Sequence, residues 1–286
     1  MRRHVLALAL LPAAAAGCLR EPDPFEYTEI ALSVHGVVRA DDRGLRLTLM
    51  RGVQGGGAEP VDAEITVSSG ATAVTLAPHD GTDPDGCYGP EYPPQAFPGC
   101  YTGTLPQAPA PGSRWQLAAD VAGGGTITGS TVVPAPPALL SPAAGTRLFF
   151  RRWEQPAEFD VAWQTPNAPR VEIRVDEGVA FQGGARLAGS SCFVAHRQVE
   201  AAVGQPSGTR HMYVDDVYCY NGPGGEIQWD SAAVPVMVTA FDSAYAEFAL
   251  HGSSVTKKRN ASLQGAYGVF GSAASARREI ILIPNR

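Results

Sequence analysis

Three carboxylates stand close together in the loop between His79 and Gly86. Asp80, Asp83 and Asp85 could supply oxygen ligands to Ca²⁺, which takes about six to eight of them. The spacing differs from that of an EF-hand loop, and the bidentate glutamate is absent. Aspartate and glycine are also ordinary turn residues. We therefore keep this loop as a calcium candidate that the turn alternative outweighs, and we expect no resident metal or cofactor.

The next segment, from Cys87 to Cys100, carries three aromatic side chains, Tyr88, Tyr92 and Phe97, among four prolines. Stiff, exposed aromatic residues make good binding anchors, because they offer contact area at a low entropic cost. The alternative is a loop whose aromatic rings pack against its own disulfide. These three residues are our candidate binding residues.

Polar groups that could catalyse a reaction are scattered over the C-terminal half. They are His196, His211, Asp215, Asp216, Glu226 and Asp230. A Ser191-His196-Asp215 triad can be drawn, but no G-x-S-x-G motif supports it, and a triad is recognised by geometry. Two of the carboxylates could hydrolyse a glycosidic bond, although any β-domain offers such pairs. We expect no catalytic residue and no enzymatic activity.

The N-terminus has the pattern of an export signal. Two arginines precede an apolar run from Val5 to Leu11, and small residues follow. The run is too short for a membrane-spanning helix, which needs about 20 residues. Ala15-Ala16-Gly17-Cys18 resembles the lipobox of bacterial lipoproteins, which implies cleavage before Cys18 and a diacylglycerol thioether on its sulfur. We expect a signal peptide over residues 1–17 and a tether over residues 18–26 that is held in a lipid bilayer through Cys18.

Leu19, and not aspartate, follows Cys18. In lipoproteins of Gram-negative cells, a residue other than aspartate at this position favours the outer membrane. Whether the protein faces the periplasm or the outside is open. Loss of residues 1–17 removes two arginines, so 20 basic against 28 acidic residues remain and the net charge becomes −8. A nucleic-acid partner is not expected, because it requires a basic surface.

The cysteine count agrees with an exported chain. Of five cysteines, four remain after Cys18: Cys87, Cys100, Cys192 and Cys219. An even remainder favours two disulfides, with three connectivities open. We favour Cys87–Cys100 and Cys192–Cys219, because each pair then lies within one predicted domain. No C-x-x-C motif or histidine at ligand spacing supports zinc.

These groups need a scaffold, and the composition favours strands. The 286 residues include 32 Gly and 24 Pro, which long helices do not tolerate. From residue 27 to 134, apolar residues alternate in about seven short segments, including Leu45-Leu47-Leu49 and Trp115-Leu117-Ala119-Val121. This pattern predicts a β-sandwich domain that ends at residue 134, where a proline-rich segment begins.

Residues 135–286 are predicted to form a second β-sandwich-like, β-rich domain. Strands are expected at 158–163, 171–175, 212–220 and 234–241. Pro235 should place the last of these at a sheet edge or delay its start. Residues 242–251 have helical spacing, with Ser243 as the expected cap, which gives one short helix. The apolar run Ile280–Ile283 predicts a short strand buried on both faces.

The layout resembles domain of unknown function family 4249, a group of bacterial envelope lipoproteins. The matching pieces are the lipobox and, in order, Val34-His35-Gly36-Val37-Val38, Ala63-Glu64-Ile65-Thr66-Val67, Cys100-Tyr101-Thr102-Gly103, Pro111 to Leu117, Thr131-Val132-Val133-Pro134 and Gly265 to Ser272. The resemblance implies an Ig-like or transthyretin-like N-terminal domain. It also implies association with a TonB-dependent outer-membrane receptor in nutrient uptake, and it carries over no catalytic residues.

The sequence thus predicts a lipid-anchored binding or accessory protein of the outer membrane that does not catalyse. A secreted hydrolase acting on glycan or peptide is one alternative. A purely structural envelope lipoprotein is the other. The ligand and the oligomeric state are left open.

Overall fold

Strands make up nearly all of the regular secondary structure in the described part of the chain. The computed structural model describes residues 32–52, 58–79, 99–166, 168–194, 199–222, 225–250 and 262–285. Within these ranges the only helix is α1 (Ser243–Leu250), and the prediction of a mainly β, sandwich-like fold is confirmed. None of the helical structure in the described ranges is long and apolar enough to cross a membrane.

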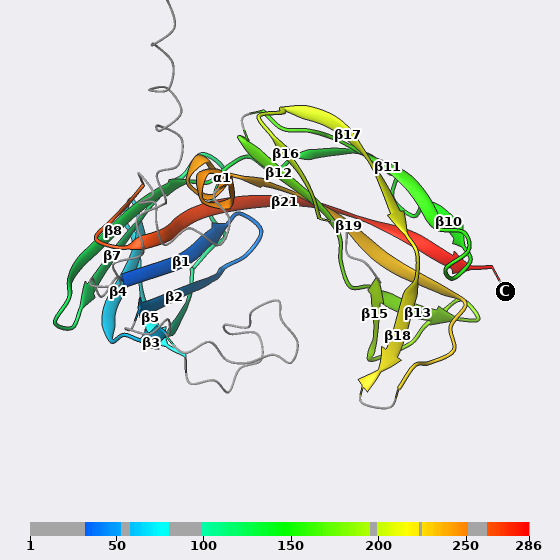
Figure 1. Cartoon of the computed structure of the whole chain (residues 1–286), viewed down its shortest axis with the longest axis horizontal. Helices are drawn as coiled ribbons and strands as arrows, with labels where there is room; N and C mark the ends of the chain where they lie inside the picture. Colours follow the sequence, from blue (N-terminus) through cyan, green and yellow to red (C-terminus); the bar gives the residue numbers. More distant parts are fainter. Residues whose placement is uncertain are drawn as a thin grey trace, which may run out of the picture.

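The first group of strands surrounds one of two hydrophobic cores (Figure 1). The strands are β1 (Leu32–Arg39), β2 (Gly44–Gly52), β3 (Ala58–Pro60), β4 (Ala63–Ser69), β5 (Thr72–Pro78), β6 (Cys100–Thr104), β7 (Arg114–Val121) and β8 (Gly125–Val132). Their hydrogen-bonded order is β1-β2-β6-β5-β4-β7-β8. Apolar residues at every second position create this core: Leu45, Leu47 and Leu49 are all buried, as predicted from their spacing.

The second group of strands surrounds the other core, which includes the fully buried Trp163. The strands are β9 (Ala138–Ser141), β10 (Arg147–Phe150), β11 (Ala157–Gln164), β12 (Arg170–Val175), β13 (Val179–Gln182), β14 (Ala185–Arg186), β15 (Ser190–Val194), β16 (Val199–Val203), β17 (Ser207–Val214), β18 (Val217–Asn221) and β19 (Ser231–Phe241). β17-β11-β9 and β15-β18 form small sheets of their own.

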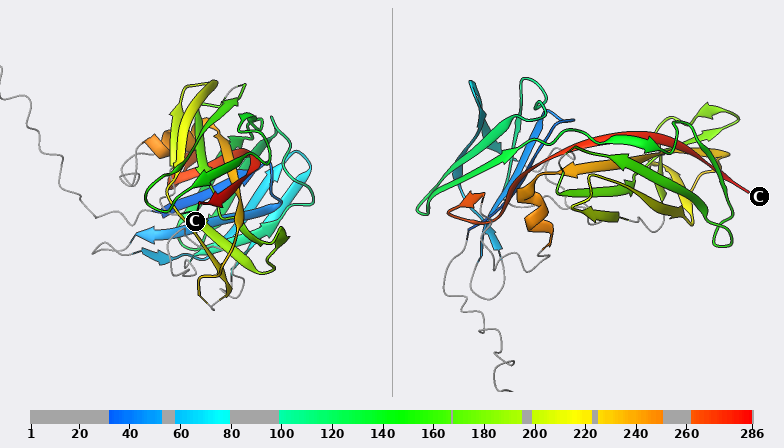
Figure 2. Two further views of the ribbon diagram at one scale, coloured as in Figure 1. Left: turned by 90° about the vertical axis from the view of Figure 1, so that its right-hand side faces the viewer. Right: turned by 90° about the horizontal axis from the view of Figure 1, so that it is seen from above.

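The last strand, β21 (Tyr267–Pro284), belongs to both groups. Its first part runs parallel to β1, and most of its length pairs antiparallel with β19. Its end runs parallel to β10. In Figures 1 and 2 it extends, in orange to red, from the first group of strands into the second. Together with β20 (Leu263–Gln264), this region adds Leu263, Ala266 and Phe270 to the first core.

The end of β21 differs from the prediction for Ile280–Ile283. Ile280 and Leu282 are fully buried, whereas Ile281 and Ile283 are only half-buried. The run is the last part of an 18-residue strand, not a short strand buried on both faces. One face of it packs on the second core, which accounts for the alternation.

Pro235 lies inside β19, and the expectation of a sheet edge or a delayed start is wrong. The strand begins at Ser231, and Pro235 pairs with Glu279 of β21. On its other side, β13 pairs with β19 up to Ala233 and β12 pairs from Val236 onward. The Pro235 carbonyl accepts a hydrogen bond from Asp176 N on that side. The missing N–H therefore falls where one neighbouring strand gives way to the next, and no ladder bond is lost.

The predicted helix is present, but its cap is Asp242 and not Ser243. Asp242 Oδ1 accepts a hydrogen bond from Tyr245 N at 3.0 Å. An aspartate one position before the first helical residue satisfies an amide that has no partner within the helix. Asp242 is the single residue between β19 and α1, so the chain turns from strand to helix at this position.

Gly268 explains part of the glycine-rich block at the start of β21. Its φ is +101°, in the region that favours glycine. A Cβ at this position would overlap the carbonyl oxygen of Val34, the residue with which it pairs on β1. Only glycine lets the two backbones approach this closely.

Candidate functional site

A two-stranded ribbon on the half of the molecule away from the first core carries the most distinctive side chains (Figure 1). It consists of β15 and β18, paired antiparallel. Cys192 and Cys219 lie directly opposite each other in this register and form a disulfide. Both are fully buried against the second core. The predicted Cys192–Cys219 pairing is therefore confirmed.

Only one of the two cysteines of the second predicted disulfide lies within the described residues. Cys100 is disulfide-bonded, whereas Cys87 lies outside the described residues. The Cys87–Cys100 pairing stays a prediction.

Alternation along the ribbon turns three aromatic rings outward. With the cysteines facing the core, Phe193, Tyr218 and Tyr220 share the opposite face, and we call these three residues the aromatic face. Phe193 and Tyr220 meet edge to face, with ring centroids 6.0 Å apart. Phe193 is 40% exposed, a large fraction for a phenyl ring on a paired strand. The ribbon thus presents an apolar surface to solvent.

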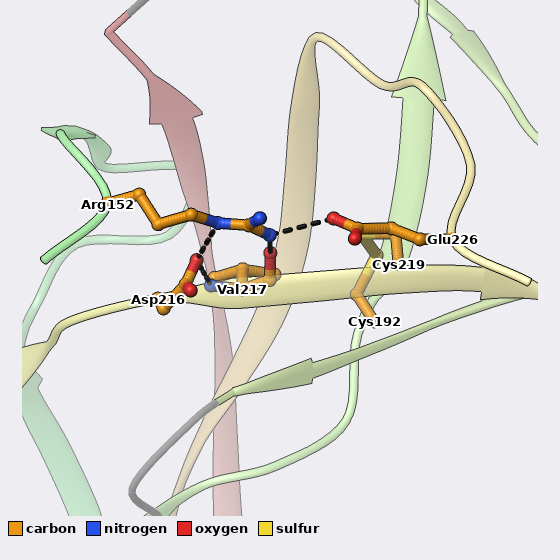
Figure 3. Close-up of polar contacts among 6 residues, drawn as sticks. All are labelled: Arg152, Cys192, Asp216, Val217, Cys219 and Glu226. Carbon is orange, nitrogen blue, oxygen red and sulfur yellow. Dashed lines mark hydrogen bonds and ion pairs between the residues drawn. A yellow bond between two sulfur atoms is a disulfide. The ribbon is translucent and has the colours of Figure 1, made fainter.

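Arg152 fixes this ribbon to the turn between β10 and β11 (Figure 3). Its Nε donates to Asp216 Oδ1 and its Nη2 to Glu226 Oε1, each at 2.7 Å. Nη2 also lies 3.3 Å from the Val217 carbonyl oxygen. The guanidinium carbon lies 4.5 Å from the centre of the Tyr218 ring, which is a cation–π arrangement. One guanidinium therefore connects the turn, two carboxylates and the aromatic face.

The electrostatics of this cluster favour the ion-paired state. Burial lowers the pKa of Arg152, but the hydrogen bonds to Glu226 and Asp216 outweigh it, so that the pKa is raised overall. Hydrogen bonding to Asp216, with a smaller effect of burial, raises the pKa of Tyr218. Asp216 Oδ1 also accepts a hydrogen bond from Val217 N at 2.8 Å. Asp216 Oδ1 thus accepts hydrogen bonds from both Arg152 and the backbone of the ribbon.

Of the polar groups considered for catalysis, the structure brings together only Asp216 and Glu226 among those it describes. Ser191 Oγ donates to Glu177 Oε2 at 3.2 Å, and His196 lies outside the described residues. The other three candidates make contacts elsewhere. His211 Nδ1 lies 3.0 Å from Asp160 Oδ1 on the β11–β17 sheet, and Asp230 Oδ2 accepts a hydrogen bond from Gly183 N at 2.7 Å. Asp215 lies between β17 and β18. The described part of the chain contains no group of three or more His, Cys, Asp or Glu that could hold a metal ion.

Several predicted site residues fall outside the described ranges. They are Cys18, the calcium candidates Asp80, Asp83 and Asp85, and the binding candidates Tyr88, Tyr92 and Phe97. All of these stay predictions.

A groove of about 700 Å³ lies between the two groups of strands. It is lined by both apolar and polar residues: Pro111, Gly112, Arg114, Ser130, Thr131, Val132, Val133, Pro134, Ala135, Pro166, Pro169, Asp242, Ser243, Ala244 and Ser262. Its buried polar contacts are internal: Thr131 Oγ1 donates to Asp242 Oδ2 at 2.6 Å. Burial raises the pKa of Asp242, although its hydrogen bonds act in the opposite direction. The carboxylate of Asp242 therefore already accepts hydrogen bonds from both β8 and the first turn of α1.

The aromatic face and Arg152 are absent from the sequence prediction. A signal for the face exists, because Phe193 follows Cys192, and Tyr218 and Tyr220 flank Cys219. If both cysteines face a core, alternation turns all three rings outward. No comparable signal exists for Arg152, whose partners lie 64 and 74 residues away in sequence.

Comparison with known proteins leaves the family open. No family model matches the chain, and no curated protein matches it. A solved DUF4785 family protein from Legionella pneumophila aligns with 76% of this chain at 14% identity and a TM-score of 0.24. The adhesin InvE from Yersinia pseudotuberculosis aligns with 88% at 15% identity and a TM-score of 0.22. The chain spans 54% and 60% of the length of these two structures.

Proposed function

We propose that this chain is a lipid-anchored protein of the outer envelope that binds a ligand without transforming it. The observation that carries the binding role is the aromatic face, which is held open on a ribbon by a buried disulfide and by Arg152. The motif Ala15-Ala16-Gly17-Cys18 supports the anchor. Rigid aromatic residues on a fixed scaffold bind at a low entropic cost.

A non-catalytic role is supported by the way in which the nearby acids are used. Asp216 and Glu226 share one guanidinium, and Asp216 has no solvent exposure. A general acid or base needs a proton that it can exchange with a substrate. Both carboxylates serve instead to hold Arg152 against the ribbon.

Photo-crosslinking tests the binding role. A benzoylphenylalanine at position 193 of the full-length protein, irradiated in cells of the native host, should give a discrete adduct. The same group at Phe149, on β10 and 55% exposed, is the matched control and should give none. No adduct at position 193, or equal adducts at both positions, would argue against a binding face on the ribbon.

The proposed partner of the whole protein is a TonB-dependent outer-membrane receptor. This part of the proposal is supported by the resemblance to family 4249 alone. Purification of the full-length protein from detergent-solubilised envelopes should recover such a receptor in stoichiometric amount. Recovery of the protein alone would leave the binding face intact but would remove the role in nutrient import.

A further inference from the structure

The backbone at both edges of the ribbon is already hydrogen-bonded. On the β15 side, Gly178 N donates to Cys192 O at 2.8 Å, and Cys192 N donates to Gly178 O at 2.9 Å. On the β18 side, Ile227 N donates to Cys219 O at 2.8 Å. A peptide that binds by strand addition needs a free edge. A ligand must therefore bind to the ribbon through the side chains of its outward face.

That face combines flat rings with polar groups beside them. Arg152 and Glu226 form an ion pair, with side chains 42% and 43% exposed, and Glu226 forms a backbone bridge to Tyr220. Ser191, which lies opposite Tyr220 in the register, donates a hydrogen bond to Glu177. Phe193 meets Tyr220 edge to face. The face thus offers hydrogen-bond donors and acceptors around an apolar centre.

The rings differ in what they can accept. The Arg152 guanidinium already covers one side of the Tyr218 ring. Phe193 and Tyr220 meet edge to face and not face to face, so part of the flat face of these rings remains for a ligand to stack on. These two residues are therefore the stacking positions.

The charges argue against an anionic ligand. Glu177 and Glu226 lie at the rim, and the positive charge of Arg152 is neutralised by its carboxylate partners. The whole chain has a net charge of −6. A ligand with many hydroxyl groups and no charge avoids this repulsion and uses both donors and acceptors.

We infer that the aromatic face binds a neutral saccharide chain, with Phe193 and Tyr220 stacking on sugar rings and the Arg152–Glu226 pair hydrogen-bonding to hydroxyl groups. A pyranose has apolar C–H faces and a hydroxyl rim, which is the complement of this surface. The inference rests on the proposed function, because it names the ligand class of the same face.

Affinity electrophoresis tests this assignment. Full-length protein in detergent is run through native gels that contain neutral glucan, mannan, galactan or xylan, with acidic alginate and a polysaccharide-free gel as references. Retardation by at least one neutral polymer is expected, with none by alginate. Phe193→Ala and Tyr220→Ala should each weaken the apparent affinity by about tenfold, while Phe149→Ala leaves it unchanged. Circular dichroism and thermal melting of each variant verify that the fold is retained.

Equal mobility of the wild type in all gels would overturn the inference, as would retardation that Phe193→Ala and Tyr220→Ala do not change. The outcome for the proposed function is separate. If benzoylphenylalanine at position 193 forms an adduct that protease digests, while no polysaccharide retards the protein, the binding face stands with a protein ligand and the saccharide assignment is wrong.

Discussion

Arg152 Nε lies 2.7 Å from Oδ1 of Asp216, whose side chain has no solvent exposure, while the Arg152 side chain is 42% exposed. The pair thus joins a buried charge to a partner at the surface. An uncompensated buried carboxylate is costly, whereas an exposed guanidinium is well solvated without a partner. The asymmetry makes Asp216 dependent on Arg152 more than the reverse.

Loss of Arg152 should therefore destabilise the ribbon. We expect Arg152→Ala to lower the free energy of unfolding by about 2 kcal/mol, less than for a fully buried pair because the guanidinium is half-exposed. The neighbouring Arg151 is the control, because its partner Glu154 is exposed and Arg151→Ala should cost less than about 0.5 kcal/mol. Urea denaturation measures both. Equal costs for the two variants would mean that the contact with Asp216 contributes nothing.

Asp242 should make stability depend on pH in a defined direction. Burial raises its pKa in the native state above the ordinary value of 3.8, so between these two values the native state binds more protons than the unfolded state. The contribution of Asp242 to stability is therefore largest below pH 3.8 and falls as pH rises through the native pKa. Asp242→Asn keeps a good helix cap but does not titrate.

The measurement is the difference in free energy of unfolding between the wild type and Asp242→Asn, taken by urea denaturation from acid to neutral pH. Groups common to both proteins cancel in this difference. The account predicts that the wild type loses stability relative to Asp242→Asn as pH rises. A difference that grows in favour of the wild type would show that hydrogen bonding to the carboxylate, and not its burial, dominates.

Gly268 should be intolerant of any side chain. Gly268→Ala brings a Cβ onto the Val34 carbonyl oxygen at a positive φ, and we expect a loss of about 3 kcal/mol or more, or failure to fold. Gly123 also has a positive φ, of +68°, but open space around it. Gly123→Ala should cost only about 1 kcal/mol. Thermal melting of the two variants separates the overlap from the backbone strain, and similar melting temperatures would refute the close approach of β21 to β1.

Local patterns predict the strands well, because burial on one face leaves a period of two in the sequence. The residues of β2, β7 and β11 alternate as their side chains do. The predicted single strand over 212–220 is wrong in one respect: it divides into β17 and β18 at Asp215 and Asp216, where the chain leaves one sheet for another. The buried positions also change phase at this break, from Met212 and Val214 to Val217 and Cys219, so the apolar pattern contains a sign of it that the prediction missed.

Pairing between distant segments could not be predicted in the same way. β1 and β21 pair in register although Ser33 and Tyr267 lie at opposite ends of the chain, and no local pattern specifies a partner strand. The same holds for the contacts of Arg152. The site therefore depends on tertiary packing, and only the cysteines and their aromatic neighbours mark it in the sequence.

The anchored role is tested most directly by intact-mass spectrometry of the protein purified from envelopes of its native host. The account predicts a chain that starts at Cys18, carries the mass of a diacylglycerol on that residue, incorporates labelled palmitate and loses all three properties in Cys18→Ser. A native polypeptide that still begins at Met1 and has no acyl mass would contradict it.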